Sequence, residues 1–202
     1  TQIGIKGSDV VVSYDFWATL TTVLTGVSGS SAISSDGTIL MAYHLANVYK
    51  STDSGATFTL ISTTVPGNVN ISSGDIVSIS DDAKVQLINI DNTDTLALSI
   101  DTGVTWSAVD LTRNWSGTAI SADGLNLLAS VADDSIFKST NTGISWQRII
   151  YVPGNVSPLP ISDISGVAIS STGQYITVAV LNIGAYTSDN FGKSYVSIPN
   201  IT

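Results

Sequence analysis

Ser99-Ile-Asp101-Thr-Gly103-Val-Thr105-Trp106 is the clearest of five related eight-residue stretches in this chain, and we call each stretch a box. A degraded copy has Trp17 in place of the glycine. The starting serines lie 38, 48, 40 and 49 residues apart, which is the period of one blade of a β-propeller. The five boxes begin at Ser13, Ser51, Ser99, Ser139 and Ser188.

A second phrase precedes each of the last four boxes at nearly constant distance. It follows the pattern Ala-Ile-Ser-x-Asp-Gly, with some variation, and begins at residues 32, 78, 119 and 168. The isoleucine of this phrase lies 18, 20, 19 and 19 residues before the serine of the box that follows it. Residues 117–150 divide into four short apolar runs joined by three turns, which is typical of one four-stranded antiparallel blade. The sequence therefore predicts an all-β propeller.

Twelve residues precede the first box, which leaves room for one strand at about residues 4–13. We therefore expect four full blades and an N-terminal half-blade in one domain, residues 1–202. The predicted half-blade covers residues 1–25, and the predicted blades cover residues 26–67, 68–113, 114–156 and 157–202.

Composition limits the classes of partner. The chain has 202 residues, no cysteine, sixteen aspartates, no glutamate, five lysines and two arginines, with a net charge of −9. Without a basic cluster, nucleic acid and anionic membranes are disfavoured as partners. No apolar run reaches the roughly 20 residues of a membrane span, so membrane insertion is not expected. The abundance of serine and threonine favours a secreted, extracellular or virion-surface module.

The box has a structural explanation. An aspartate or asparagine accepts hydrogen bonds from turn amides, and the glycine two residues later permits left-handed backbone. The terminal aromatic residue is predicted to pack between sheets. The residues assigned this role are Asp15; Ser51, Asp53, Gly55 and Phe58; Ser99, Asp101, Gly103 and Trp106; Ser139, Asn141, Gly143 and Trp146; and Ser188, Asn190, Gly192 and Tyr195.

These boxes resemble the Asp-box, or BNR, repeat of sialidases, sortilin-type receptors, xyloglucanases and photosystem II assembly factors. The resemblance implies that each box lies between the third and fourth strands of a blade, away from the functional face, so that nothing catalytic carries over from it. Sialidases of the family use three arginines and a Tyr/Glu pair. This chain has only Arg113 and Arg148 and no glutamate, which disfavours sialidase activity.

The predicted function is therefore non-catalytic binding or structural assembly, with protein or glycan engaged through propeller loops or an open sheet edge. The alternative is a glycoside hydrolase that acts on polysaccharide with a pair of aspartates. Four residues in predicted loops are the candidate binding residues: Arg113 and Trp115, a cation close to an aromatic residue, and Tyr43 and His44. The competing interpretation of Trp115 is that it packs between blades and binds no ligand. The competing interpretation of His44 is a loop or packing role.

No cofactor or metal is expected. A single histidine disfavours a zinc site, and Asp91, Asn92 and Asp94 fit a solvated turn better than a Ca²⁺ loop. Four sequons would be N-glycosylation sites in a eukaryotic secretory pathway: Asn70, Asn114, Asn155 and Asn200.

The incomplete first blade leaves three alternatives open. The chain is a fragment of a larger propeller, a protomer completed by another copy through strand addition, or a small irregular five-bladed ring. Strands from a longer chain, or self-association, would complete the blade in the first two. Five apolar residues near the N-terminus are expected to be buried: Val10, Val11, Val12, Phe16 and Trp17.

Overall fold

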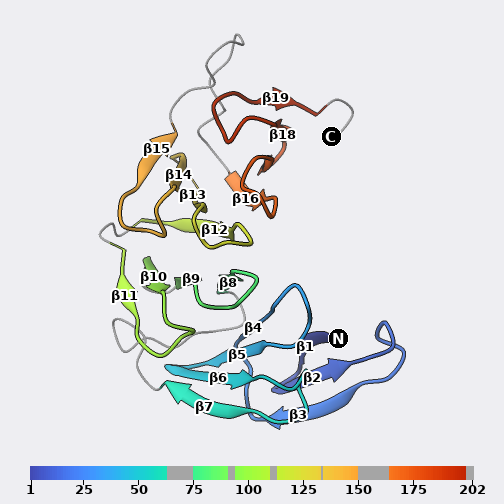
Figure 1. The fold of residues 1–202 in the computed structure, drawn as a ribbon. Helices are drawn as coiled ribbons and strands as arrows, with labels where there is room; N and C mark the ends of the chain where they lie inside the picture. The colour runs from blue at the N-terminus through green and yellow to red at the C-terminus, as the bar shows by residue number, and fades with distance from the viewer. Residues whose placement is uncertain (63–74, 91–93, 110–112, 133, 150–163, 199–202) are drawn as a thin grey trace.

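The computed structural model describes residues 1–62, 75–90, 94–109, 113–132, 134–149 and 164–198. This part of the chain contains nineteen strands and no helix, arranged as five antiparallel sheets that follow one another in chain order around an arc (Figure 1). The predicted all-β propeller architecture is confirmed.

Each sheet is a simple meander of neighbouring strands. The first sheet holds β1 (Gln2–Lys6), β2 (Asp9–Ser13) and β3 (Thr21–Thr25). The second holds β4 (Ser30–Ile33), β5 (Leu40–His44), β6 (Asn47–Ser51) and β7 (Thr59–Ser62). The third holds β8 (Ile76–Ile79), β9 (Gln86–Ile90), β10 (Thr95–Ser99) and β11 (Ser107–Ala108). The fourth holds β12 (Trp115–Ile120), β13 (Leu127–Val131), β14 (Ile136–Ser139) and β15 (Gln147–Ile149). The fifth holds β16 (Ile164–Ile169), β17 (Ile176–Val180), β18 (Gly184–Ser188) and β19 (Val196–Ser197).

The core lies between the sheets. Four clusters of buried apolar side chains join the first sheet to the second, the second to the third, the third to the fourth, and the fourth to the fifth. Strands β9 and β13 are buried along their whole length because each has a sheet on both sides. In β17 of the fifth sheet, buried Ile176, Val178 and Val180 alternate with exposed Thr177 and Ala179. One face of that strand is therefore packed and the other is open.

The inner strands border a central cavity of about 390 Å³, lined by residues of β4, β8, β12 and β16. The first sheet contacts the second through β1 and β4. Among the described strands, no contact of similar extent joins the first sheet to the fifth. The described strands therefore form an arc whose two ends are not packed together, as Figure 1 also shows.

The first sheet is more complete than the expected half-blade. Two strands, β1 and β2, precede the first box, and Gly7 at φ 64° lies in the turn between them. Since β1 pairs with β2 as β5 pairs with β6, β1 corresponds to the second strand of the other sheets. The single expected strand at residues 4–13 is corrected to a hairpin, because a two-residue turn needs less chain than we allowed.

All five boxes adopt the same hydrogen-bonded turn. In the second box, Ser51 Oγ donates to Asp53 Oδ1 (2.7 Å) and accepts from the Gly55 amide (2.9 Å). Asp53 also accepts from the amide of Thr57 (2.9 Å) and from its hydroxyl (2.6 Å). The second phrase folds similarly, with Ser34 bonded to Asp36, and the two turns of one sheet are joined by the Ser54 amide and the Thr38 carbonyl (3.0 Å). Both turns therefore lie at one end of each blade, which we call the box face.

Trp17 has a different role from the glycines of the other boxes. It keeps their left-handed backbone, with φ 69°, which is strained for a residue with a side chain. Its ring folds back over Gly4, where a Cβ atom would lie 3.0 Å from the indole. Gly4 is paired with Val11, so the indole lies on the face of the first sheet that carries both residues. Trp17 thus covers part of a face on which none of the described sheets packs.

The burial expected near the N-terminus holds only in part. Val10, Val11 and Val12 are buried, whereas Phe16 is 92% exposed and Trp17 is 45% exposed. Phe16 lies at the tip of the box turn, and its backbone has φ 56°. Because that tip projects from the box face, the expectation of burial was wrong for Phe16, and it was also wrong for Trp17, which remains exposed at the edge of the same turn.

The box turns predict an acid-sensitive stability. Hydrogen bonds from the Thr57 hydroxyl and amide, and then from the Ser51 hydroxyl, lower the pKa of Asp53 to about 2. The pKa values of Asp15, Asp36, Asp82, Asp101 and Asp123 are also lowered. A carboxylate whose folded-state pKa lies below its unfolded value stabilises the fold above that unfolded value, near 4, and this contribution is lost as the pH falls toward 2. The urea midpoint should therefore be constant above about pH 5 and fall between pH 4 and pH 2.

Asp53→Asn is the matched test, because the fourth and fifth boxes carry asparagine at this position. In the fourth box Asn141 Oδ1 accepts from the Ser145 amide, and its Nδ2 donates to the Ser145 hydroxyl (both 2.9 Å). The variant should keep the fold and lose part of the acid-dependent decline in the urea midpoint. An unchanged decline would show that Asp53 does not contribute to it.

Candidate functional site

Two grooves on the box side lie at equivalent positions between neighbouring sheets. Each is bordered by the third and fourth strands of one sheet and by the box turn of the next sheet. The first, which we call the apolar groove, has a volume of about 350 Å³. It is lined by Leu98, Ile100, Thr105, Trp106, Ser107, Thr142, Gly143 and Ile144.

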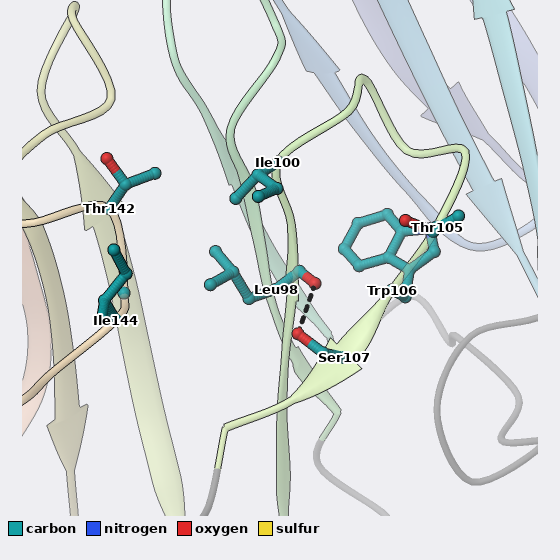
Figure 2. Close-up of a pocket in the computed structure, with 8 residues that line it drawn as sticks. Leu98, Ile100, Thr105, Trp106, Ser107, Thr142 and Ile144 are labelled. Atoms are coloured by element: carbon teal, nitrogen blue, oxygen red, sulfur yellow. Dashed lines mark hydrogen bonds between the residues drawn. The ribbon is translucent and has the colours of Figure 1, made fainter.

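Figure 2 shows how the apolar groove is built. Thr142 and Ile144, from the box turn of the fourth sheet, face Leu98 and Ile100 of the third sheet. Trp106 borders the groove while packing against Tyr43 of the second sheet, with ring centroids 6.4 Å apart and the rings at 79°. Ile144 is 86% exposed. The groove therefore presents aliphatic and aromatic surface to solvent.

The second groove, which we call the basic groove, lies between the fourth and fifth sheets and has a volume of about 390 Å³. Its lining combines three positively charged side chains with polar and apolar ones: Asn126, Lys138, Thr140, Gln147, Arg148, Ile149, Phe191, Gly192 and Lys193. Lys138 directly precedes the box serine as Leu98 does, and Lys193 follows the box glycine as Ile144 does. The same backbone frame thus carries aliphatic side chains at these two positions in one groove and lysines in the other.

Lys138 makes two contacts with Phe191 in the basic groove. Its ammonium group donates to the carbonyl of Phe191 (2.7 Å) and lies 5.8 Å from the centroid of the Phe191 ring. Burial, and then the charge of Lys193, lowers the pKa of Lys138. The two ammonium groups therefore repel each other, and a bound anion would relieve that repulsion.

At the opposite, loop end of the blades, Asp134 brings the two arginines together. It pairs with Arg113 Nη1 (3.2 Å) and with Arg148 Nη2. Arg148 Nε also donates to the Ser135 hydroxyl (2.7 Å), and the Arg113 guanidinium lies 4.6 Å above the Phe137 ring. One carboxylate is thus shared by two guanidinium groups, so its single negative charge balances part of their combined positive charge.

Next to this cluster, Trp115 is a core residue. It is buried, and its ring meets Phe137 edge-on with centroids 5.6 Å apart. The Asn89 amide donates to the Trp115 carbonyl (2.8 Å). Trp115 Nε1, Asn89 Oδ1 and Arg113 Nε are buried without a hydrogen-bond partner among the described residues. Trp115 therefore packs between blades, as the alternative to a binding role had predicted.

The predicted binding residues are not brought together in one site. Tyr43 is fully buried and donates to Gln86 Oε1 (3.0 Å), so its side chain belongs to the core and not to a ligand-contacting surface. Burial raises the pKa of Tyr43. His44 is half-buried, and its Nδ1 accepts from the Ser28 amide (3.2 Å), which anchors a loop. Arg113 and Trp115 lie together elsewhere, between the third and fourth sheets.

Several predicted positions lie outside the described residues: Asn70, Asn155, Asn200, Asp91 and Asn92. Asn114 is exposed, and its carbonyl accepts from the Ala132 amide (2.9 Å). The carbonyl of Asp94 accepts from the Arg113 amide (3.2 Å). In the described part of the chain, no group of three metal-ligating side chains comes together. The same part contains no helix long and apolar enough to cross a membrane.

Sequence reasoning missed the basic groove. Lys138 and Lys193 are 55 residues apart, and neither belongs to a motif on its own. The available signal was their register, since one precedes a box serine and the other follows the glycine of the next box. That register becomes spatial proximity only because consecutive sheets pack side by side.

Comparison with known proteins supports the architecture. No family model matches the chain, and no curated protein matches it by sequence. Among solved structures, a GH74 enzyme from Niastella koreensis has a TM-score of 0.64 at 20% identity over 96% of this chain and 29% of its own. A GH74 xyloglucanase from Xanthomonas campestris has a TM-score of 0.63 at 16% identity over 95% of this chain and 34% of its own. YCF48 from Cyanidioschyzon merolae has a TM-score of 0.65 at 14% identity over 96% of this chain and 65% of its own.

These likenesses concern the fold. The chain spans about a third of the length of the two GH74 structures and about two thirds of YCF48. The class of protein is therefore that of the β-propellers, with a fold found both in GH74 enzymes and in YCF48.

Proposed function

We propose that this chain is a non-catalytic binding module that holds a glycan in the grooves between its blades. The observation that carries the proposal is the chemistry of the described grooves. Their lining combines aromatic rings, amides, hydroxyl groups and ammonium groups, which are the groups that bind sugars. Repeated boxes like those of Asp-box proteins would supply the rigid frame.

The aspartates support a non-catalytic role. Glycoside hydrolysis requires two opposed carboxyl groups, one of which has a raised pKa. Wherever the pKa of a described aspartate departs clearly from its ordinary value, it is lowered. In the described part of the chain, no aspartate lines the central cavity, either groove or the small pocket at the N-terminus. All six aspartates with a lowered pKa fix box or phrase turns, where ionisation strengthens the hydrogen bonds. The fold shared with GH74 enzymes makes a polysaccharide hydrolase the second candidate.

The acidic, cysteine-free and serine- and threonine-rich composition supports a place outside the cell or on a virion surface. Exposed Asn114 is within a sequon and would be accessible to glycosylation there.

A glycan array combined with a hydrolysis screen tests the proposed function. We expect the protein to retain one or more polysaccharides without releasing shorter products. Release of shorter products would favour a hydrolase. The proposal would be overturned if Asp94→Asn or Asp134→Asn abolished this turnover while the box variant Asp53→Asn left it intact. Failure to bind any glycan on the array would also overturn it.

A further inference from the structure

We propose that the basic groove between the fourth and fifth sheets recognises an acidic glycan, through the carboxylate or sulfate groups of its sugars. This inference rests on the proposed binding function and adds the site and the ligand class. It follows from the position of Lys138 and Lys193, the repeat equivalence of the two grooves, and the remaining lining of the basic groove.

The first observation is that positive charge is concentrated in the basic groove. The chain carries seven basic residues against sixteen aspartates, and three of the seven line this one groove: Lys138, Arg148 and Lys193. Arg148 pairs with Asp134 at the loop end of the blades, whereas neither Lys138 nor Lys193 has an ion pair among the described residues, so the two lysines are the unpaired cations of the groove. No carboxylate is part of the lining. A local surplus of positive charge on a molecule of net charge −9 attracts an anionic group that the rest of the surface repels.

The repeat shows that the fold does not need these lysines. The equivalent positions in the apolar groove are Leu98 and Ile144, and both grooves have the same backbone frame. Lys138 on β14 and Lys193 in the box turn of the fifth sheet repel each other, and this repulsion, after burial, contributes to the lowered pKa of Lys138. Since packing does not require two mutually repelling cations, a ligand of opposite charge accounts for their presence.

The other lining groups favour a sugar over an acidic peptide. Phe191 is half-exposed beside the Lys138 ammonium and offers a flat apolar face to a pyranose ring. The side-chain amides of Asn126 and Gln147 provide both donors and acceptors for hydroxyl groups. Lys138 is already oriented by the Phe191 carbonyl, so little side-chain freedom is lost when an anion binds.

The experiment uses the whole chain and three substitutions. Lys138→Leu and Lys193→Ile introduce the residues that the apolar groove carries at the same positions. Lys50→Leu is the matched control, because Lys50 precedes the box serine of the second sheet and its removal changes the net charge equally. Affinity electrophoresis and calorimetry would measure binding to polygalacturonate, dextran sulfate, neutral xyloglucan and poly-glutamate. Circular dichroism and thermal unfolding would establish that each variant is folded.

We expect at least one of the two acidic polysaccharides to bind more tightly than xyloglucan and poly-glutamate. Each groove substitution should weaken that binding by about tenfold, the value of one charge-assisted hydrogen bond, while Lys50→Leu changes it by less than about twofold. Equal losses in all three variants would mean a general charge effect and would overturn the inference. So would equally tight binding of poly-glutamate or xyloglucan, or affinities unchanged by both groove substitutions. Release of shorter products from a bound polymer would instead contradict the proposed non-catalytic function.

Discussion

Trp106→Ala should lower the free energy of unfolding by about 3 kcal/mol, near the low end of the range for a large aromatic side chain because Trp106 is only partly buried. The indole packs against the cluster between the second and third sheets and meets Tyr43 edge-on. Its Nε1 also donates to the carbonyl of Gly103 (2.9 Å), which connects the strand after the box to the box turn. Alanine removes both the packing and the hydrogen bond.

Trp106→Phe is the control for this prediction. It keeps a six-membered ring against Tyr43 and loses the indole hydrogen bond and part of the packed surface, so its cost should be smaller than that of alanine. Urea unfolding followed by circular dichroism gives both values. Because the sheets form a linear array, hydrogen exchange should increase first in the second and third sheets. If Trp106→Ala unfolds at the wild-type urea midpoint, the inter-sheet contact does not stabilise the propeller.

Gly29→Ala should be at least as damaging, with an expected loss of about 3 kcal/mol because the added methyl group has no space. A Cβ atom on buried Gly29 would overlap the carbonyl oxygen of Tyr43 and lie 2.6 Å from its carbonyl carbon. Both are backbone atoms of β5, which pairs with β4 directly after Gly29. The clash can be relieved only if the innermost strand moves away from its partner.

Gly26→Ala separates this steric effect from backbone strain. Gly26 has φ 72°, but nothing lies within 4 Å of the position that its Cβ would occupy. Its substitution should cost about 1 kcal/mol, from left-handed backbone alone. In thermal and urea unfolding, the midpoint of Gly29→Ala should be well below that of Gly26→Ala. Equal midpoints would contradict the close approach of Gly29 to β5.

The grooves show why part of the site could not be predicted from the sequence. Arg113 and Trp115 drew attention because they are close together in a loop, yet Trp115 is buried against Phe137. Tyr43 and His44 were chosen from a predicted loop, but β5 extends through both, and the Tyr43 ring is fully enclosed between sheets. For Tyr43 and His44, proximity along the chain was a poor guide because successive residues of a strand point to opposite faces. Lys138 and Lys193 became neighbours only through the packing of two blades.

The sequence by itself determined the blades. A box fixes its turn through contacts within eight residues, as Ser51 and Asp53 show, and its repetition at a blade period sets the strand order. These interactions are local, so their pattern can be read without knowing the fold. Only the tertiary structure decided that Trp17 covers Gly4, that Asp134 pairs with both arginines, and that two lysines share one groove. Those contacts depend on the angle and distance between successive sheets, which are set by the summed packing of many side chains and leave no short motif in the chain.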